Sequence, residues 1–373
     1  MDVKIYEQAD IDVWNNFVIG TKNFHFFFQR GYMDYHKDRF QDFSLMIYND
    51  KGQLISVLPA NIFYDGDKKI LVSHGGLTFG GFLTNEKMKV ETMLDIFDAV
   101  KQFLRENNFS SLIYKCIPYI YWKYPSEEDK YALFINDAKL IRRDVSSTVI
   151  PPPSRVFMRH GVFDSLRKAK KKNVQVVQSY KYNEYIKMLS EVLKKYHDAI
   201  PVHTGAELKM LAERFPENIK LYTGEVDDKI LAGAVVFENG DTVHTQYLAN
   251  SDEGRNIGAL DCVIDYLLRD VYADKKYFDF GISNENAGRY LNCGLIAQKE
   301  GFGARAVVHD FYELTISREE ENIVNYSQNQ RGGAVCRLIF IGKICVLLLS
   351  VKTIFLCAAC YKFFMQRMCS YGS

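Results

Sequence analysis

Hydrophobic and polar residues follow two different periods along this chain, and the change of period separates predicted helices from predicted strands. Apolar residues recur every three or four positions over about Met88–Arg105 and Tyr182–Tyr196, as expected for amphipathic helices. Apolar and polar residues alternate over Phe43–Tyr48 and Gln53–Phe63, and a polar turn joins these two predicted strands. The pattern therefore predicts a fold that mixes helices with antiparallel strands.

The second half of the chain has its own succession of strands and helices. Three strands are expected in meander order, at Ile219–Val226, Lys229–Glu238 and Thr242–Leu248, with turn residues between them. A helix is expected at Leu260–Tyr272 and a short aromatic strand at Tyr277–Phe280, followed by a polar loop and another helix. Such a strand edge, opening onto carboxylate, amide and lysine side chains, is where α/β proteins commonly place their chemistry.

The length of 373 residues allows two domains of ordinary size. Pro151-Pro152-Pro153 marks the boundary, because consecutive prolines interrupt both helices and strand ladders. The halves on either side share a rough order of helices, strand meander, helix and further strands, although no residue-level repeat is visible. We predict a first domain at 1–150, a linker at 151–162, a second domain at 163–317 and a tail at 318–373.

The tail is hydrophobic over residues 334–365, but Lys343 and Lys352 interrupt the run. Each of these charges would cost about 2.5–3.5 kcal/mol at the centre of a bilayer. Three interpretations stay open: an interfacial or tilted membrane anchor, a helix that binds a partner, and a C-terminus unrelated to the core. Five of the eight cysteines lie in this tail, and without a secretory signal we expect free thiols rather than disulfides.

Charge and composition argue against several classes of function. The formal net charge is +1, so we expect no DNA partner, and tRNA is a weaker candidate than a small molecule. Because the histidines are dispersed and the cysteines are concentrated in the tail, we expect no metal site. Neither a Walker loop nor a G-x-S-x-G elbow occurs. We expect a cytoplasmic protein whose basic tail residues suit the inner face of a membrane.

One segment has the composition of an anion site. Arg255-Asn256-Ile257-Gly258-Ala259 follows the strand meander and opens the predicted helix. Backbone N–H groups at a helix N-terminus attract anions such as a pyrophosphate, and the Arg255 guanidinium could add further donors. Ordinary turns use the same residues, so the segment alone does not decide between an anion site and a turn.

This order of elements resembles the GNAT acyltransferase superfamily, in which a Q/R-x-x-G-x-G/A loop holds the pyrophosphate of acyl-CoA. Arg255 and Gly258 fit that pattern, whereas Leu260 replaces its last small residue. The resemblance implies acyl-CoA, with acetyl-CoA as the simplest case, as the donor. The cofactor-binding residues that it implies are Arg255, Asn256, Gly258 and Ala259.

Three further segments resemble the Fem-like branch of that superfamily, whose members join two GNAT-type domains in one chain. They are the basic helix Leu166–Val174, the strand Tyr277–Gly281, and Lys299–Gly303, which is similar to an FK-x-GFG motif with Gln298 in place of Phe. The resemblance covers about residues 1–317, and the chain also looks like the version found in bacterial surface-polysaccharide gene clusters. It implies an α/β (α+β) chain of two tandem domains, each with a mixed, mainly antiparallel sheet flanked by helices, plus a hydrophobic helical tail.

The chemistry that this resemblance implies is direct attack of an amine on a thioester. It needs a base for the ammonium, donors to the oxyanion and an acid for the leaving group. Glu285 is the candidate base because it directly follows the late strand, with helix capping or a surface position as the alternative. Tyr290, expected on the next helix, is the candidate acid, with packing as the alternative. We expect Asp279, between two Phe residues, to form a structural hydrogen bond.

Candidates for binding the acceptor come from both halves. Tyr35, His36 and Arg39 form an aromatic and basic cluster that suits a sugar or nucleotide, although a helix that packs its rings inward has the same pattern. His203 and Thr204 precede a predicted helix, where Thr204 could also act simply as an N-cap.

Three more residues are candidates for the same cleft. Lys299 could hold a phosphate of the donor or acceptor, or be solvated. Gln246 and His244 alternate along the third meander strand and could line the cleft, Gln246 as a cofactor-binding residue. A satisfied core histidine is an equally good interpretation of His244.

The sequence therefore predicts an N-acyltransferase that moves an acyl group from acyl-CoA to an amine. The expected acceptor is a nucleotide- or lipid-linked amino sugar in cell-surface polysaccharide biosynthesis. One alternative is an aminoacyl-tRNA-dependent, Fem-type peptidyltransferase. Another is a catalytically inactive scaffold held at the membrane by its tail, against which measurable CoA binding would count.

Overall fold

The computed structural model describes residues 1–154, 158–316, 337–341 and 344–348. The chain divides into two units, Met1–Arg318 and Glu319–Ser373. In the second unit, β18 (Arg337–Ile341) and β19 (Ile344–Leu348) form an antiparallel pair where the sequence predicted a helix. The rest of the tail, and with it most of the segment predicted to contact a membrane, lies outside the described residues. None of the described helices is long and apolar enough to cross a membrane.

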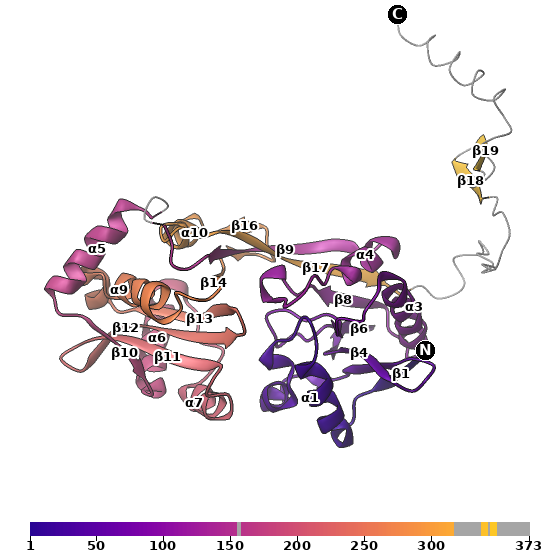
Figure 1. Cartoon of the computed structure of the whole chain (residues 1–373), viewed down its shortest axis with the longest axis horizontal. Helices are drawn as coiled ribbons and strands as arrows, with labels where there is room; N and C mark the ends of the chain where they lie inside the picture. Colours follow the sequence, from indigo (N-terminus) through magenta and orange to yellow (C-terminus); the bar gives the residue numbers. More distant parts are fainter. Residues whose placement is uncertain (155–157, 317–336, 342–343, 349–373) are drawn as a thin grey trace, which may run out of the picture. The chain divides into compact units, whose positions relative to one another are not determined.

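One mixed sheet organises the first unit (Figure 1). Two neighbouring pairs of strands are parallel and the other neighbours are antiparallel, which confirms the predicted mixed, mainly antiparallel sheet flanked by helices. In the described residues, its eleven strands lie in the order β10 (Gln175–Ser179), β11 (Ile219–Val226), β12 (Lys229–Asn239), β13 (Thr242–Asn250), β14 (Tyr277–Ile282), β9 (Lys139–Val149), β17 (Arg305–Thr315), β8 (Ser111–Lys115), β6 (Lys68–Val72), β5 (Asn61–Asp65) and β2 (Gln41–Asp42).

A smaller sheet belongs to the first half of the chain. The long strand predicted at Gln53–Phe63 is two strands, β4 (Leu54–Leu58) and β5, which belong to different sheets. The break follows Leu58 at Pro59, whose nitrogen has no hydrogen to donate to a ladder. The order of the smaller sheet is β1 (Asp2–Ile5), β3 (Leu45–Tyr48), β4 (Leu54–Leu58) and β7 (Leu83–Thr84).

The last strands of the two halves are exchanged. β9 closes the first half in sequence but pairs with β14 of the second half, with Val149 opposite Phe278. β17 closes the second half but pairs with β8 of the first, with Thr315 opposite Ser111. The two strands also pair with each other along their length (Figure 1). Both halves therefore share one continuous sheet, and the domain boundaries drawn from the sequence stay a prediction.

Helices cover the sheets through their apolar faces. In α3, the buried residues Met93, Ile96, Phe97, Val100 and Leu104 follow the three-to-four spacing that predicted this helix. The helix expected at Leu260–Tyr272 is α9 followed by a π-helical turn. The helices are α1 (Ile11–Ile19), α2 (Arg30–Met33), α3 (Val90–Glu106), α4 (Glu128–Ile135), α5 (His160–Lys171), α6 (Tyr182–His197), α7 (Gly205–Arg214), α8 (Asp252–Ile257), α9 (Ala259–Tyr266) and α10 (Cys293–Glu300).

An aromatic core joins the two halves. The Phe26 ring lies 5.5 Å from the rings of both Phe215 and Phe237, measured between centroids. Asn239 adds polar contacts to the same segment, because its Oδ1 accepts from Phe26 N at 3.1 Å and its Nδ2 donates to Phe24 O at 2.8 Å. Burying one Phe side chain contributes roughly 1.5–3 kcal/mol. The halves therefore form one folded unit rather than loosely linked domains.

Each half also contains a β–α–β unit with parallel strands. In the first half α3 connects β6 to β8, and in the second half α8 and α9 connect β13 to β14. The parallel pairing of β13 with β14 extends only from Thr242–Tyr277 to His244–Asp279. Beyond that point the two strands diverge, and this divergence positions the candidate site.

Candidate active site

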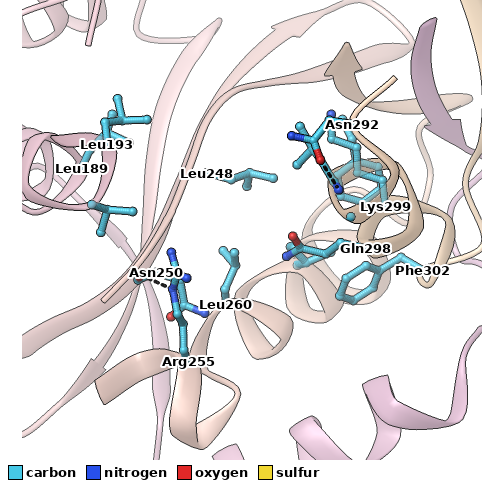
Figure 2. Close-up of a pocket in the computed structure, with 15 residues that line it drawn as sticks. Leu189, Leu193, Leu248, Asn250, Arg255, Leu260, Asn292, Gln298, Lys299 and Phe302 are labelled. Atoms are coloured by element: carbon cyan, nitrogen blue, oxygen red, sulfur yellow. Dashed lines mark hydrogen bonds between the residues drawn. The ribbon is translucent and has the colours of Figure 1, made fainter. Parts of the chain in front are cut away.

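A cavity of about 520 Å³ lies where β13 and β14 diverge (Figure 2). β13 contributes Leu248 and Asn250, and β14 contributes Phe280. Its other walls come from α6, from Arg255 and Leu260 at the α8–α9 junction, and from α10. We call this the first cavity. It is large enough for part of an extended ligand and is mainly apolar, with polar side chains at its edge.

A β-bulge interrupts β13 next to this opening. Val236 of β12 lies opposite Thr245, but its neighbour Val235 lies opposite Tyr247, so Gln246 is an extra residue without a partner. In the described residues, the side of β13 that faces β14 has no strand partner beyond His244. A bulge at a free strand edge leaves backbone N–H groups available to a ligand.

The predicted anion loop is largely helical. Arg255 and Asn256 lie in α8 rather than in a turn, and Gly258 follows with φ of +77°. Arg255 lines the first cavity, with Nε donating to Asn250 O at 3.3 Å and the guanidinium 4.1 Å from the Tyr196 ring. Asn256 is exposed, and neither it nor Ala259 lines this cavity. The geometry therefore places Arg255 at the cavity and leaves Asn256 and Ala259 outside it.

Lys299 lines the first cavity, but its ammonium bonds to the backbone. Nζ donates to Gly281 O and to Ile282 O, both at 2.8 Å, which uses two of its three hydrogens. Burial lowers the pKa of Lys299 to about 8. The side chain thus ties α10 to the end of β14 and keeps at most one donor for a ligand.

The predicted catalytic pair lies on a surface hairpin. Tyr290 is not on a helix: β15 (Asn284–Glu285) pairs with β16 (Tyr290–Leu291), and Glu285 lies directly opposite Tyr290. The helix cannot start earlier because Asn286, Ala287 and Gly288 all have positive φ, which turns the chain back. Both side chains are exposed, and neither lines the first cavity. Their catalytic roles stay predictions.

A second cavity of about 300 Å³ collects four predicted acceptor residues, Tyr35, His36, Arg39 and His203, together with Gln246. Gln246, predicted to bind the cofactor, thus lies here and not in the first cavity. Nε2 of His203 is 2.8 Å from the Tyr35 hydroxyl. Burial lowers the pKa of His203 to about 4 and raises that of Tyr35 to about 12, so both groups are neutral near pH 7.

Two neighbouring groups frame the second cavity. Arg39 forms an ion pair with Glu207 of the second half. Thr204 does not line the cavity but is the N-cap of α7, where its hydroxyl accepts from Glu207 N at 3.1 Å. The contacts of Thr204 are therefore those of an N-cap. Glu207, which bonds to Thr204, also pairs with Arg39.

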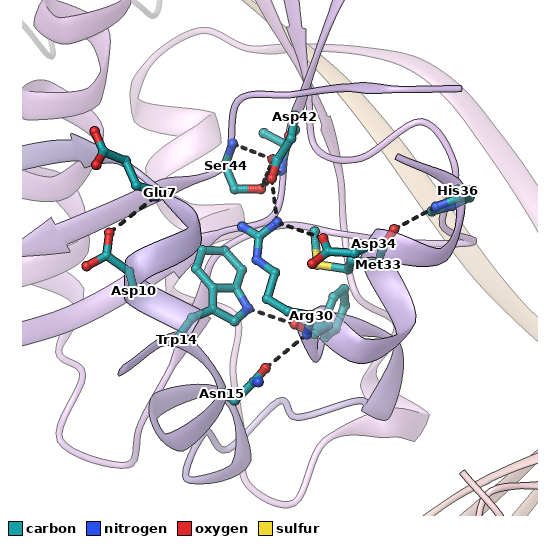
Figure 3. A network of polar contacts seen from close by, with 12 residues as sticks. Glu7, Asp10, Trp14, Asn15, Arg30, Met33, Asp34, His36, Asp42 and Ser44 are labelled. Atoms are coloured by element: carbon teal, nitrogen blue, oxygen red, sulfur yellow. Dashed lines mark hydrogen bonds and ion pairs between the residues drawn. The ribbon is translucent and has the colours of Figure 1, made fainter. Parts of the chain in front are cut away.

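A buried arginine holds the segment that carries Tyr35 and His36 (Figure 3). Arg30, at the start of α2, is 1% exposed and lies 3.4 Å from the Tyr6 ring centroid and 4.1 Å from that of Trp14. Its Nη1 lies 2.5 Å from Asp42 Oδ2. The sequence showed no pattern that would single out this residue.

A third cavity of about 540 Å³ adjoins the second, because Gly75, Leu77 and Thr78 line both. Its ionisable residues are Lys115, Arg142, Asp144 and His309. Burial lowers the pKa of Lys115 to about 7. Sequence reasoning missed all four residues, because they alternate with neighbours on ordinary strands and form no recognisable motif.

The diverging strands separate the first cavity from the other two. β13 places Gln246 in the second cavity and Leu248 in the first. β14 places Phe280 in the first cavity and Ile282 in the third. The opening between the strands therefore has the first cavity on one side. On its other side lie the second and third cavities, which residues of both halves line.

The sequence matches the family model for the acetyltransferase (GNAT) domain over residues 164–290. Residues 164–290 are a GNAT acetyltransferase domain. This match covers β10 to β15 and therefore includes the diverging strands and the walls of the first cavity from α6, β13, β14 and the α8–α9 junction, but not the wall from α10. The comparison with curated proteins finds no match.

Solved structures extend the similarity of fold to both halves of the chain. The crystal structure of FemX has a TM-score of 0.58 at 12% identity and covers 83% of this chain and 97% of its own. A conserved protein of unknown function from Bacteroides thetaiotaomicron VPI-5482 has a TM-score of 0.54 at 10% identity, with 84% and 99% covered. At these identities the similarity shows the fold, and at that level the predicted resemblance to Fem-like GNAT proteins is confirmed.

Proposed function

We propose that this GNAT protein transfers an acyl group from acyl-CoA to the amine of a small acceptor, with a nucleotide- or lipid-linked amino sugar as the favoured class. The observation that carries the proposal is the opening between β13 and β14, which has a cavity on each side. In this arrangement the donor occupies the first cavity and its thioester reaches the opening. The acceptor occupies the groove formed by the second and third cavities.

The first cavity suits the donor for two reasons. Arg255 at its edge offers a charged group to a pyrophosphate, and Leu248, Leu260 and Phe280 offer apolar surface to the pantetheine arm. The bulge at Gln246 adds backbone N–H groups next to the opening, where the oxyanion of a tetrahedral intermediate would form.

The groove suits a polar, uncharged or weakly anionic acceptor. The second cavity has aromatic rings and neutral hydrogen-bonding groups, among them Tyr35 and His203, which suit a sugar. The third adds Arg142 and Lys115, whose charges suit phosphate groups on the acceptor, although Nζ of Lys115 also donates to His74 O at 3.0 Å and to Leu77 O. A role in cell-surface polysaccharide biosynthesis, in the cytoplasm at the inner face of the membrane, is part of this proposal and follows from the sequence resemblance alone.

Calorimetric titration of the full chain with acetyl-CoA tests the donor assignment. We expect Arg255→Ala to weaken binding by about tenfold or more, since a hydrogen bond to a charged group contributes about 1.5–3 kcal/mol. Arg167→Ala, on the exposed face of α5, removes the same charge away from the cavity and is the matched control. Absence of acetyl-CoA binding at millimolar concentration, with binding of aminoacyl-tRNA, would replace acyl-CoA by aminoacyl-tRNA as the donor.

A further inference from the structure

His244 and Asp279 form the last pair of residues before β13 and β14 diverge. Their side chains lie on the face of the sheet that meets the first half, because Asp279 accepts a hydrogen bond from Tyr121 of that half at 2.9 Å. The His244 side chain is 10% exposed, whereas that of Asp279 is fully buried. An imidazole therefore lies at the point from which the opening between the cavities widens.

Asp279 fixes the protonation of this imidazole. Its carboxylate accepts from the hydroxyls of Ser146 at 2.5 Å and Thr148 at 3.0 Å, in addition to Tyr121, and lies 2.8 Å from Nδ1 of His244. A carboxylate can only accept hydrogen bonds, so Nδ1 must carry the hydrogen. The lone pair of neutral His244 is then on Nε2, which has no hydrogen bond to any described residue.

The backbone beside Nε2 is kept clear of side chains. Gly281 follows Asp279 in β14 with φ of +76°, and a Cβ at this position would lie 3.2 Å from Cε1 and 3.9 Å from Nε2 of His244. Lys299 holds this stretch in place through its bonds to Gly281 O and Ile282 O. A glycine therefore borders the ring edge that carries the lone pair.

Two further buried histidines lie near His244. His25 comes from the segment before the Phe26–Phe28 turn and His309 from β17, and burial lowers the pKa of both. Their Nε2 atoms are buried without a hydrogen-bond partner among the described residues. Burial also raises the pKa of Tyr121, and the Lys299 ammonium, bonded to Gly281 O, lies near Asp279. Unpartnered buried nitrogens next to an available imidazole indicate a place for a polar guest group.

We propose that His244 is the general base of the acyl transfer, with Asp279 as its positioning residue. This inference rests on the proposed function. The acceptor nitrogen attacks the thioester carbonyl and forms the C–N bond, and Nε2 of His244 takes the proton that the nitrogen loses. The C–S bond then breaks, and the imidazolium returns the proton to the CoA thiolate. Amine and thioester thus become amide and thiol, and His244 is neutral again.

The geometry favours His244 over Glu285 for this step. Glu285 is exposed on the β15–β16 hairpin, and its Oε1 accepts from Asn292 Nδ2 at 3.2 Å. His244 does not itself line any of the three cavities, but it ends the β13–β14 pairing beside the opening and is held in one tautomer by a buried carboxylate. An Asp–His arrangement of this kind both orients the imidazole and stabilises the imidazolium that forms in the reaction.

Substitution of His244 with Asn tests the role by kinetics. With acetyl-CoA and a panel of amino sugars, we expect kcat/KM at pH 7 to fall by about 10²–10⁴-fold, the usual contribution of a general base. The acetyl-CoA affinity should stay within twofold of wild type, and the rate should rise again at high pH as the amine loses its proton unaided. Glu285→Gln tests the alternative base, and His160→Asn, at an exposed histidine of α5, is the matched control. A kcat/KM within threefold of wild type, or loss in Glu285→Gln instead, would overturn the proposal.

A second measurement needs neither turnover nor the His244 variant. It therefore tests the role of His244 even if that variant misfolds or the proposed function is wrong. Nitrogen-15 NMR of histidine-labelled wild-type protein reports which ring nitrogen of His244 carries hydrogen. We expect the Nδ1–H tautomer, and its loss in Asp279→Asn. An Nε2–H tautomer would overturn the role of His244 even if the chain proves to be an acyltransferase. An Nδ1–H tautomer in a chain that binds no acyl-CoA would instead contradict the proposed function.

Discussion

The hydroxyl of Tyr35 lies 2.8 Å from Nε2 of His203, and this contact links the two halves of the chain at the second cavity. Nδ1 of the same imidazole is 2.7 Å from the Tyr247 hydroxyl. The ring is therefore fixed from both sides by tyrosines, one from each half. Its position in the cavity depends on how the halves associate.

Removing the Tyr35 hydroxyl should weaken the association of the halves. Tyr35→Phe keeps the ring but leaves Nε2 of His203 buried without its partner. We expect the free energy of unfolding to fall by about 0.5–1.5 kcal/mol, as for one buried hydrogen bond, in a urea titration. Acetyl-CoA affinity should not change, because the first cavity lies on the other side of β13. Tyr180→Phe, at an exposed tyrosine, is the control and should have no effect. An equal loss in both variants would contradict the prediction.

Buried histidines should make the protein sensitive to mild acid. Burial lowers the pKa of His203 from 6.5 to about 4, so the unfolded chain binds a proton near pH 6.5 that the folded chain does not. The stabilisation is complete above pH 6.5 and is lost as the pH falls towards 4. One such group changes the free energy of unfolding by up to about 1.4 kcal/mol per pH unit. His203→Asn should reduce this slope between pH 6.5 and 4.5, measured by urea titration at each pH.

Two other buried titratable residues, His74 and Asp129, also change stability over this pH range. Burial lowers the pKa of His74 to about 3, so this residue also makes the protein less stable as the pH falls. It remains in the variant and contributes equally to both slopes. Asp129 has the opposite effect on stability. Burial raises its pKa to about 6, so its contribution to the free energy of unfolding grows as the pH falls. The comparison is therefore between slopes of wild type and variant, with exposed His160→Asn as the control. Equal slopes for wild type and His203→Asn would show that His203 is accessible to protons in the folded state.

Local patterns predicted most elements of this fold but not their pairing. The spacing of apolar residues in α3 and the alternation in β11 to β13 depend only on which face is buried, so they are visible in the sequence. The exchange of β9 and β17 depends on pairing between residues more than a hundred positions apart, which no local pattern encodes. The hairpin that replaced the expected helix at Tyr290 depends on positive φ at Asn286 and Ala287, which other residues adopt rarely.

The candidate site shows the same limit. The aromatic and basic spacing of Tyr35, His36 and Arg39 was visible, and the structure brings these residues to one cavity with His203. The contact between His244 and Asp279 joins different strands, so only the alternation of polar and apolar residues along each strand was visible beforehand. A site formed by side chains of two paired strands depends on the register between those strands, and no local sequence pattern specifies that register.

Gly258 was predicted from sequence as part of an anion loop, but the structure gives it a packing role. A Cβ on Gly258 would lie 2.5 Å from Ser165 O of α5, and its φ is +77°. Gly52 has φ of +70° with nothing within 4 Å, so Gly52→Ala isolates the conformational cost, about 1 kcal/mol. Gly258→Ala should cost at least about 2 kcal/mol more, because α5 must move. If both variants lose the same free energy of unfolding in urea titrations, α5 can move away from residue 258 at no cost. That result would favour the anion-loop interpretation.

The Arg30–Asp42 pair allows a test of how a buried cation is stabilised. Among the described residues, Nε and Nη2 of Arg30 have no hydrogen-bond partner, so Asp42 and the two aromatic rings carry most of its stabilisation. Asp42→Asn leaves a buried charge without its carboxylate, and we expect a loss of about 2–3 kcal/mol, towards the low end for buried pairs because Asp42 is partly exposed. Asp34 lies 3.7 Å away and compensates only in part.

Arg30→Met should be less harmful than Asp42→Asn, although it removes the larger side chain. Methionine keeps the apolar stem between Tyr6 and Trp14 and removes the charge that needs a partner. The double variant should then be no less stable than Arg30→Met alone, since Asp42 would have no cation left to pair with. Urea titrations of the two single variants and the double variant complete the cycle. If Arg30→Met proves the more damaging single change, the cation–π contacts with the two rings contribute more than the ion pair with Asp42.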